Sequence, residues 1–125
     1  MPVSYVIDKG NRLVVCTGTG VVTFEDIEAF RKQILRDPGF DPSFSQLGDM
    51  SDAKLDLSAD EVKILAEQSP FSLRSWRALV GESLEVYGLA RMFEIVRGLR
   101  GDQHIHVFRT RDEALAWLFE ERKAA

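Results

Sequence analysis

Short apolar runs alternate with longer amphipathic segments along most of the chain. The first two runs, residues 3–7 and 13–17, are rich in β-branched residues and are separated by Asp-Lys-Gly-Asn at 8–11. β-Branched runs favour strands, and glycine and asparagine suit a tight reversal. The pattern predicts a hairpin at the start of the chain, with Gly18 and Gly20 ending its second strand.

Four later segments place apolar residues at helical spacing, and most of them follow a capping sequence. The clearest example is Ser58-Ala59-Asp60-Glu61, a capping box in which serine accepts from the third amide and glutamate reaches back to the cap. We expect helices over residues 24–35, from Ser58 to near Pro70, over 83–97, and from Thr110 through Leu118.

Shorter apolar runs separate these helices and predict three more strands, at residues 44–50, 77–80 and 104–108. The expected order is therefore β-β-α-β-α-β-α-β-α. Strands that alternate with helices indicate parallel pairing through right-handed crossovers. The sequence thus predicts an α/β fold with a mixed, mostly parallel five-stranded sheet and four helices, as a single domain over residues 1–125.

Composition limits which partners the chain could bind and in which cellular compartment we expect it. The chain has 125 residues, 45% of them hydrophobic and 29% charged, which is ordinary for a globular protein. Its net charge of −4 argues against a generic nucleic-acid binder. A single cysteine excludes an internal disulfide and fits a reducing compartment. The start lacks a signal peptide, and no apolar run is long enough to span a bilayer, so we expect a cytoplasmic protein.

Several stretches resemble the STAS domain superfamily, and more closely its SpoIIAA-like group of small bacterial proteins, which are often described as STAS/CRAL-TRIO-like. The resemblance spans nearly the whole chain and rests on four stretches. They are residues 40–44 (FDPSF), 55–62 (LDLSADEV), 87–94 (YGLARMFE) and 112–118 (DEALAWL). The run Gly-Leu-Ala-Arg-Met is the most distinctive.

The resemblance implies a five-strand, four-helix layered fold without catalysis or cofactor. For the narrower group it implies a carrier or sensor of nonpolar molecules. For the broader family it implies an anti-sigma-factor antagonist regulated by a phosphoserine in a turn after the third strand. Ser51 in Asp49-Met50-Ser51-Asp52 matches that serine, but the glycine that should follow is absent. Phosphate beside Asp49 and Asp52 would also be repelled.

The third helix has more apolar surface than one sheet face requires, because apolar residues nearly encircle it. Three explanations stay open: deep packing in the core, a homodimer or partner-protein face, and a pocket for a nonpolar ligand. The preceding loop supplies further apolar residues. Our candidate binding residues are Phe71, Leu73, Trp76, Tyr87, Arg91, Met92 and Phe93. Arg91 stacks on Tyr87, meets an acidic ligand head group, or pairs with Glu94 at helical spacing.

Residue chemistry offers little for an enzyme. The acids from Asp49 to Asp60 lack the spacing of a calcium loop. His104 and His106 share a strand face, but no cysteine or third histidine completes a zinc set. Cys16 lies within a strand and is expected to be buried. We therefore expect no enzyme and no metal, with a small hydrolase using Asp49, His104 or His106 as the alternative.

Overall fold

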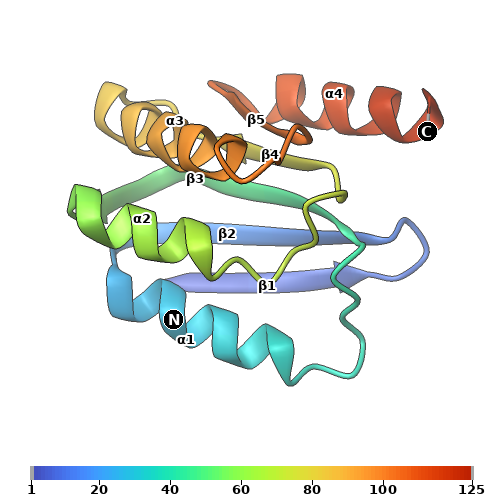
Figure 1. Cartoon of the computed structure of the whole chain (residues 1–125), viewed down its shortest axis with the longest axis horizontal. Helices are drawn as coiled ribbons and strands as arrows, with labels where there is room; N and C mark the ends of the chain where they lie inside the picture. The colour runs from blue at the N-terminus through green and yellow to red at the C-terminus, as the bar shows by residue number, and fades with distance from the viewer. Residues whose placement is uncertain (1, 125) are drawn as a thin grey trace.

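The computed structural model describes residues 2–124, which form five strands and four helices in the order expected from the sequence (Figure 1). The strands are β1 (Val3–Asp8), β2 (Leu13–Thr23), β3 (Ser45–Asp56), β4 (Arg77–Val80) and β5 (Ile105–Phe108). The helices are α1 (Phe24–Leu35), α2 (Ala59–Glu67), α3 (Leu84–Gly98) and α4 (Arg111–Ala124). In this described part of the chain, no helix is both long and apolar enough to cross a membrane.

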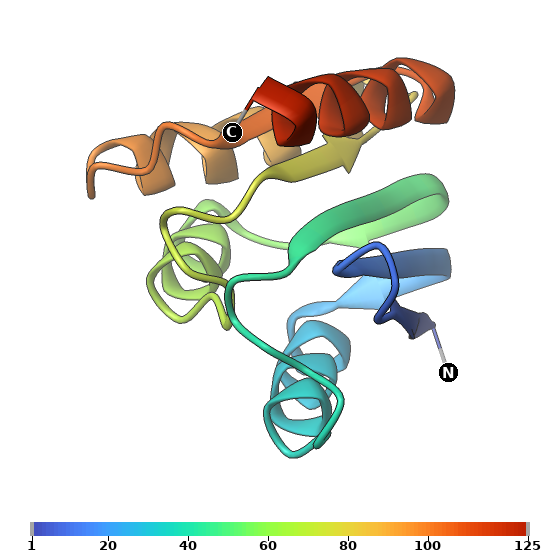
Figure 2. The same cartoon turned by 90° about the vertical axis from the view of Figure 1, so that its right-hand side faces the viewer.

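The five strands form one sheet in the order β1-β2-β3-β4-β5. β1 pairs antiparallel with β2, and every other neighbouring pair is parallel. Each parallel connection moves one strand along in the same direction, so crossovers of one hand place all three connecting helices on one face. α1, α2 and α3 lie on that face, whereas α4 follows the last strand and covers the other (Figure 2). The predicted mixed, mostly parallel α/β fold is confirmed.

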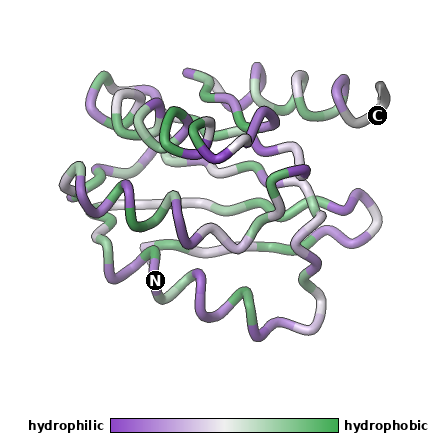
Figure 3. The backbone as a smooth tube through the Cα atoms, viewed as in Figure 1, coloured by the Kyte–Doolittle hydropathy of each residue, from purple (hydrophilic) through white to green (hydrophobic). Residues whose placement is uncertain are grey.

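Alternation along the strands divides the apolar residues between two cores. Val14 and Cys16 of β2 face the three-helix side, where they join Phe30 of α1 in one buried cluster. Leu13 and Leu47 face the other side and pack in a cluster with residues of α4. The helices match this division, as green and purple alternate along α1 in Figure 3.

The expected capping sequences begin the helices. Thr23 and Ser58 each form a capping box, with Asp26 and Glu61 respectively. The Ser83 side chain accepts from the Val86 amide at the start of α3. These bonds satisfy amides that have no partner inside the helix, which explains why the helix starts were predictable from sequence.

β2 and β3 are longer than expected, and the predicted end of the second strand at Gly18 and Gly20 is wrong. The two strands pair on both sides of a bulge, where Thr17 lies opposite Asp49 and Thr19 opposite Asp52. Gly18 leaves room there for the Met50 side chain, which would have to move if position 18 carried a Cβ. Glycine in a strand can therefore mark a bulge instead of a strand end.

Three buried charged side chains tie the end of α3 to the sheet. Asp102, in the loop before β5, accepts from Arg77 of β4 and from Nε of Arg97 of α3, the latter at 3.2 Å. The exposed fractions of these residues are 1% for Arg77, 6% for Arg97 and 4% for Asp102. Arg97 also donates to the Ala66 carbonyl of α2 at 2.9 Å. Burial lowers the pKa of Arg77, and Asp102 opposes that shift.

We predict that Asp102→Asn destabilises the fold by about 3–5 kcal/mol, because it leaves two buried guanidinium groups without a counter-charge. Urea denaturation measures the loss. Glu67→Gln is the control, since Glu67 pairs with Arg100 at the surface and its loss should cost less than about 1 kcal/mol. Equal losses in the two variants would contradict the prediction.

Candidate functional site

An apolar cavity of about 140 Å³ lies between the sheet and the layer of α1, α2 and α3, and it is partly open to solvent. Its floor comes from the central strands and includes Cys16 of β2, Gln46 and Gly48 of β3, and Leu79 of β4. Gly48 allows this arrangement, because a Cβ there would lie 2.8 Å from Leu79 Cδ2.

The helices form the roof of the cavity. The contributing residues are Ile27, Phe30 and Arg31 of α1, Val62 and Leu65 of α2, and Val86, Leu89, Ala90 and Phe93 of α3. The four α3 residues have the spacing of one helix face. α2 and α3 pack closely on each other, whereas α1 touches α2 only sparsely. α1 is therefore less closely joined to α2 than α3 is.

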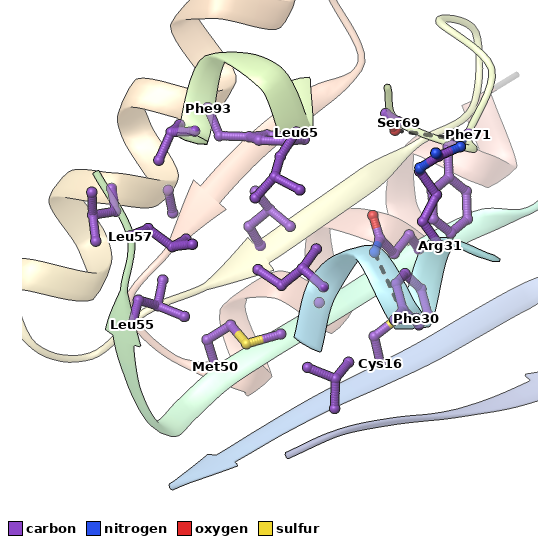
Figure 4. A pocket seen from close by; sticks show the side chains of 18 of the residues that line it. Cys16, Phe30, Arg31, Met50, Leu55, Leu57, Leu65, Ser69, Phe71 and Phe93 are labelled. Carbon is purple, nitrogen blue, oxygen red and sulfur yellow. Dashed lines mark hydrogen bonds between the residues drawn. The ribbon is translucent and has the colours of Figure 1, made fainter. Parts of the chain in front are cut away.

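Two loop regions complete the walls at opposite ends of the cavity. Leu55 and Leu57 come from the end of β3 and the residues after it, and Ser69 and Phe71 come from the loop after α2. Figure 4 shows Leu55 and Leu57 at one end of the ring of lining side chains, with Arg31, Ser69 and Phe71 at the other. Phe93 lies near Leu57 in the same view, so this end of the cavity is wholly apolar, whereas the other end is aromatic and polar.

Cys16 is the cavity residue with reactive chemistry. Burial raises the pKa of its thiol to about 12, although a hydrogen bond from Gln46 Nε2 at 3.4 Å opposes the shift. The thiol is therefore neutral at physiological pH, and a neutral thiol is a poor nucleophile. Cys16 contributes to the floor as a small apolar side chain.

The seven predicted binding residues do not come together in one place. Phe71 and Phe93 line the cavity, and Phe71 also packs edge-to-face on Phe40 with ring centroids 5.4 Å apart. Leu73 is exposed and Met92 half-buried, and neither lines the cavity.

Tyr87, Arg91 and Trp76 have other contacts. The Arg109 guanidinium lies 4.3 Å from the Tyr87 ring centroid, and Arg91 pairs with Glu94. Trp76 belongs to the cluster beneath α4, on the opposite face of the sheet from α3. Of the interactions considered for Arg91, the structure has the pair with Glu94, and contact with an acidic ligand head group stays a prediction.

Ser51 lies within β3, at the bulge, and not in a turn that leads into a helix. Its hydroxyl donates to Asp49 Oδ1 at 2.6 Å, and its amide donates to the same oxygen at 3.0 Å. Burial by itself would raise the pKa of Asp49, but these bonds and Arg111 hold it below its ordinary value. The expected turn around Ser51 is thus replaced by a bulged strand.

Asp49 and the two histidines occupy different parts of the sheet. Asp49 pairs with Val80 at the carboxyl end of β4, whereas His104 precedes β5 at the opposite end. His104 packs edge-to-face against Trp76, and His106 Nδ1 lies 3.6 Å from Glu94 Oε2. Among the described residues, no three His, Cys, Asp or Glu side chains are grouped so that they could hold a metal ion.

Sequence reasoning missed most of the cavity wall, including Gly48, Leu55, Leu57 and Leu79. One signal was present, since apolar and polar residues alternate from Ala53 to Leu57, as in a half-buried strand. The Gly48–Leu79 contact joins positions 31 residues apart and leaves no local pattern.

A second hollow lies between β1 and the end of α1 and includes Tyr5, Lys9 and Asp37. Its polar groups bind one another, as the Tyr5 hydroxyl donates to Asp37 Oδ2 at 2.8 Å and the Gly39 amide donates to Oδ1 at 2.9 Å. Burial and this carboxylate raise the pKa of Tyr5 to about 12. The polar groups of this hollow are therefore already used, and the apolar cavity is the better candidate for a ligand site.

Comparison with solved structures identifies the fold. An uncharacterised DUF3478-family protein from Shewanella loihica PV-4, described as having a SpoIIAA-like fold, is similar over 93% of this chain and 93% of its own. The TM-score is 0.55 and the sequence identity 16%, so the likeness concerns the fold alone. No protein-family model and no curated protein matches the chain. The expected SpoIIAA-like fold is confirmed.

We predict that Cys16 does not react with a thiol reagent such as Ellman's reagent at pH 8 in the folded protein and reacts once guanidinium unfolds it. Ser43→Cys, at an exposed position, provides a fast-reacting control.

The pKa of the Cys16 thiol is about 9.0 when the thiol is exposed and about 12 in the folded protein. The unfolded state therefore loses its proton first, and stability should fall as the pH rises through this range. Rapid labelling of native Cys16 would contradict the prediction.

Proposed function

We propose that this domain binds a small nonpolar molecule in the cavity between the sheet and α1–α3 and acts as its carrier or sensor. The observation that supports this most is the cavity itself, whose wall is almost entirely aliphatic and aromatic. Apolar cavities of about 150 Å³ in other proteins stay dry and bind benzene or xenon. A volume of about 140 Å³ therefore fits a ligand body of one ring or a short branched chain.

A binding role without catalysis agrees with the chemistry of the site. The Cys16 thiol is held neutral, and the group hydrogen-bonded to its sulfur is the Gln46 amide, which donates and cannot act as a base. The hydrolase alternative has less support, because the strand register keeps Asp49 away from His104. The anti-sigma-factor antagonist alternative also has less support, because Ser51 lies in a strand bulge beside Asp49.

We predict that Ala90→Leu abolishes binding of benzene or weakens it at least ~10-fold, since the larger side chain fills the space that the ligand would occupy. Amide chemical shifts of the wild-type protein, titrated with benzene, should move at residues 46–50 and 86–93. Benzene at a free concentration of 100 times its Kd should also raise the free energy of unfolding by about 2.7 kcal/mol, which thermal unfolding detects.

Ala116→Leu is the matched control, because Ala116 is exposed on α4 and lies on the other side of the sheet. It should bind benzene as the wild type does. Binding that is unchanged in Ala90→Leu, or shifts confined to α4, would contradict the proposed site.

A second candidate function, self-association, is favoured by the outer face of α3. Leu84, Ile95 and Leu99 are 80%, 55% and 84% exposed, and all three lie on one face of the helix. Arg91 lies midway along this face and is paired with Glu94. If the α3 helices of two copies packed antiparallel, Leu84 of one copy would meet Leu99 of the other. The Arg91–Glu94 ion pairs, which carry no net charge, would then lie at the centre of the interface.

We predict that the double variant Ile95→Lys/Leu99→Lys reduces concentration-dependent self-association without lowering thermal stability, because both side chains are exposed in the single chain. Sedimentation velocity over a range of concentrations measures the effect. Leu73→Lys, at an exposed position in the loop before β4, is the control. A wild-type protein that stays monomeric at every concentration would contradict this candidate function.

A further inference from the structure

The cavity contains one charged group in an otherwise apolar wall. Among the described residues that line it, Arg31 of α1 is the only one with an ionised side chain. The side chain is 26% exposed, so it reaches from the cavity to the surface. It lies at the aromatic and polar end, together with Phe71 and Ser69 (Figure 4).

The hydrogen-bonding capacity of Arg31 is incompletely used. Its Nε is buried and forms an ion pair with Glu28 Oε1 at 3.5 Å, in which neither atom has a hydrogen-bond partner among the described residues. A buried donor without a partner is costly, and a guanidinium gains most from a carboxylate that it can meet with two parallel bonds. Arg31 is therefore placed to donate to a ligand oxygen at the cavity rim, where the ligand competes with Glu28 for the guanidinium.

Neighbouring groups add donors at the same end. Gln68 and Ser69 both line the cavity, and the Ser69 oxygen accepts only a long bond of 3.4 Å from the Phe71 amide. The Ser69 hydroxyl hydrogen can therefore point toward a bound anion. Leu55, Leu57 and Phe93 elsewhere in the wall offer contacts only to an apolar group.

We propose that the ligand is a small aryl or branched aliphatic carboxylic acid, bound with its apolar body in the cavity and its carboxylate on Arg31. This inference rests on the proposed function and names the class of ligand for the same site. The cavity volume of about 140 Å³ holds the ring, and the charged group lies at the rim where Arg31 meets solvent. A guanidinium matches the planar carboxylate in both charge and geometry.

The test compares benzoate with nitrobenzene, a neutral molecule of the same shape. Kd values come from amide chemical shifts of the full chain at constant ionic strength. We expect the wild type to bind benzoate at least ~10-fold more tightly than nitrobenzene, as one charge-assisted hydrogen bond provides. Arg31→Met should abolish this preference while leaving the Kd for nitrobenzene within about threefold, because the apolar wall is unchanged.

Lys32→Met removes the same charge from the next, exposed residue of α1 and should preserve the preference for benzoate. Arg31→Gln gives a second variant in case the methionine perturbs folding. The inference is overturned if the wild type binds both molecules equally, or if Lys32→Met and Arg31→Met weaken benzoate binding equally. In those cases binding of nitrobenzene would still support the proposed function, whereas binding of neither molecule would refute both.

Discussion

The architecture of the three-helix face depends on the carboxylate of Asp102. It bridges two buried guanidinium groups, Arg77 at the start of β4 and Arg97 near the end of α3, and its second oxygen accepts the His104 amide at 3.1 Å. Arg97 extends the network to the last turn of α2 through Ala66. The free energy needed to remove such charges from water is about as large as the free energy gained from their attraction. The network therefore contributes more to the positions of the helices than to the net stability of the fold. It fixes where α2 and α3 lie relative to the sheet.

This fixed position explains how an apolar cavity persists beneath the helices. Enclosed voids in protein interiors cost about 24 cal/mol per Å³, so about 3 kcal/mol is the upper limit of the penalty for this partly open cavity of about 140 Å³. A freely packing helix would move to close such a space. α2 and α3 are held at one end by Arg97, while Gly48 lets Leu79 lie across the floor. A ligand that fills the space would recover part of the penalty, and this is the physical argument for the binding site proposed above.

Local chemistry made the fold predictable, and long-range chemistry limited the prediction of the site. Capping boxes at Thr23 and Ser58 and the alternating runs gave the element order. The surplus of apolar residues on α3 made Phe93 a candidate binding residue, and Phe93 lines the cavity. Trp76 was included because it is near in sequence, but residues on a strand alternate between faces, and Arg77 occupies the face toward α3. The Arg77–Asp102 pair spans 25 residues and has no local signature.

The apolar surplus of α3 has two separate explanations, one for each side of the helix. Val86, Leu89, Ala90 and Phe93 line the cavity, while Leu84, Ile95 and Leu99 are exposed on the outer face. Sequence periodicity showed only that the apolar residues nearly encircle the helix and left core, ligand and partner as alternatives. Since Arg91 and Glu94 pair with each other, the charges that interrupt the apolar surface need no outside partner. The inner face therefore bears on the proposed ligand binding and the outer face on the proposed self-association, and a substitution on one side need not disturb the other.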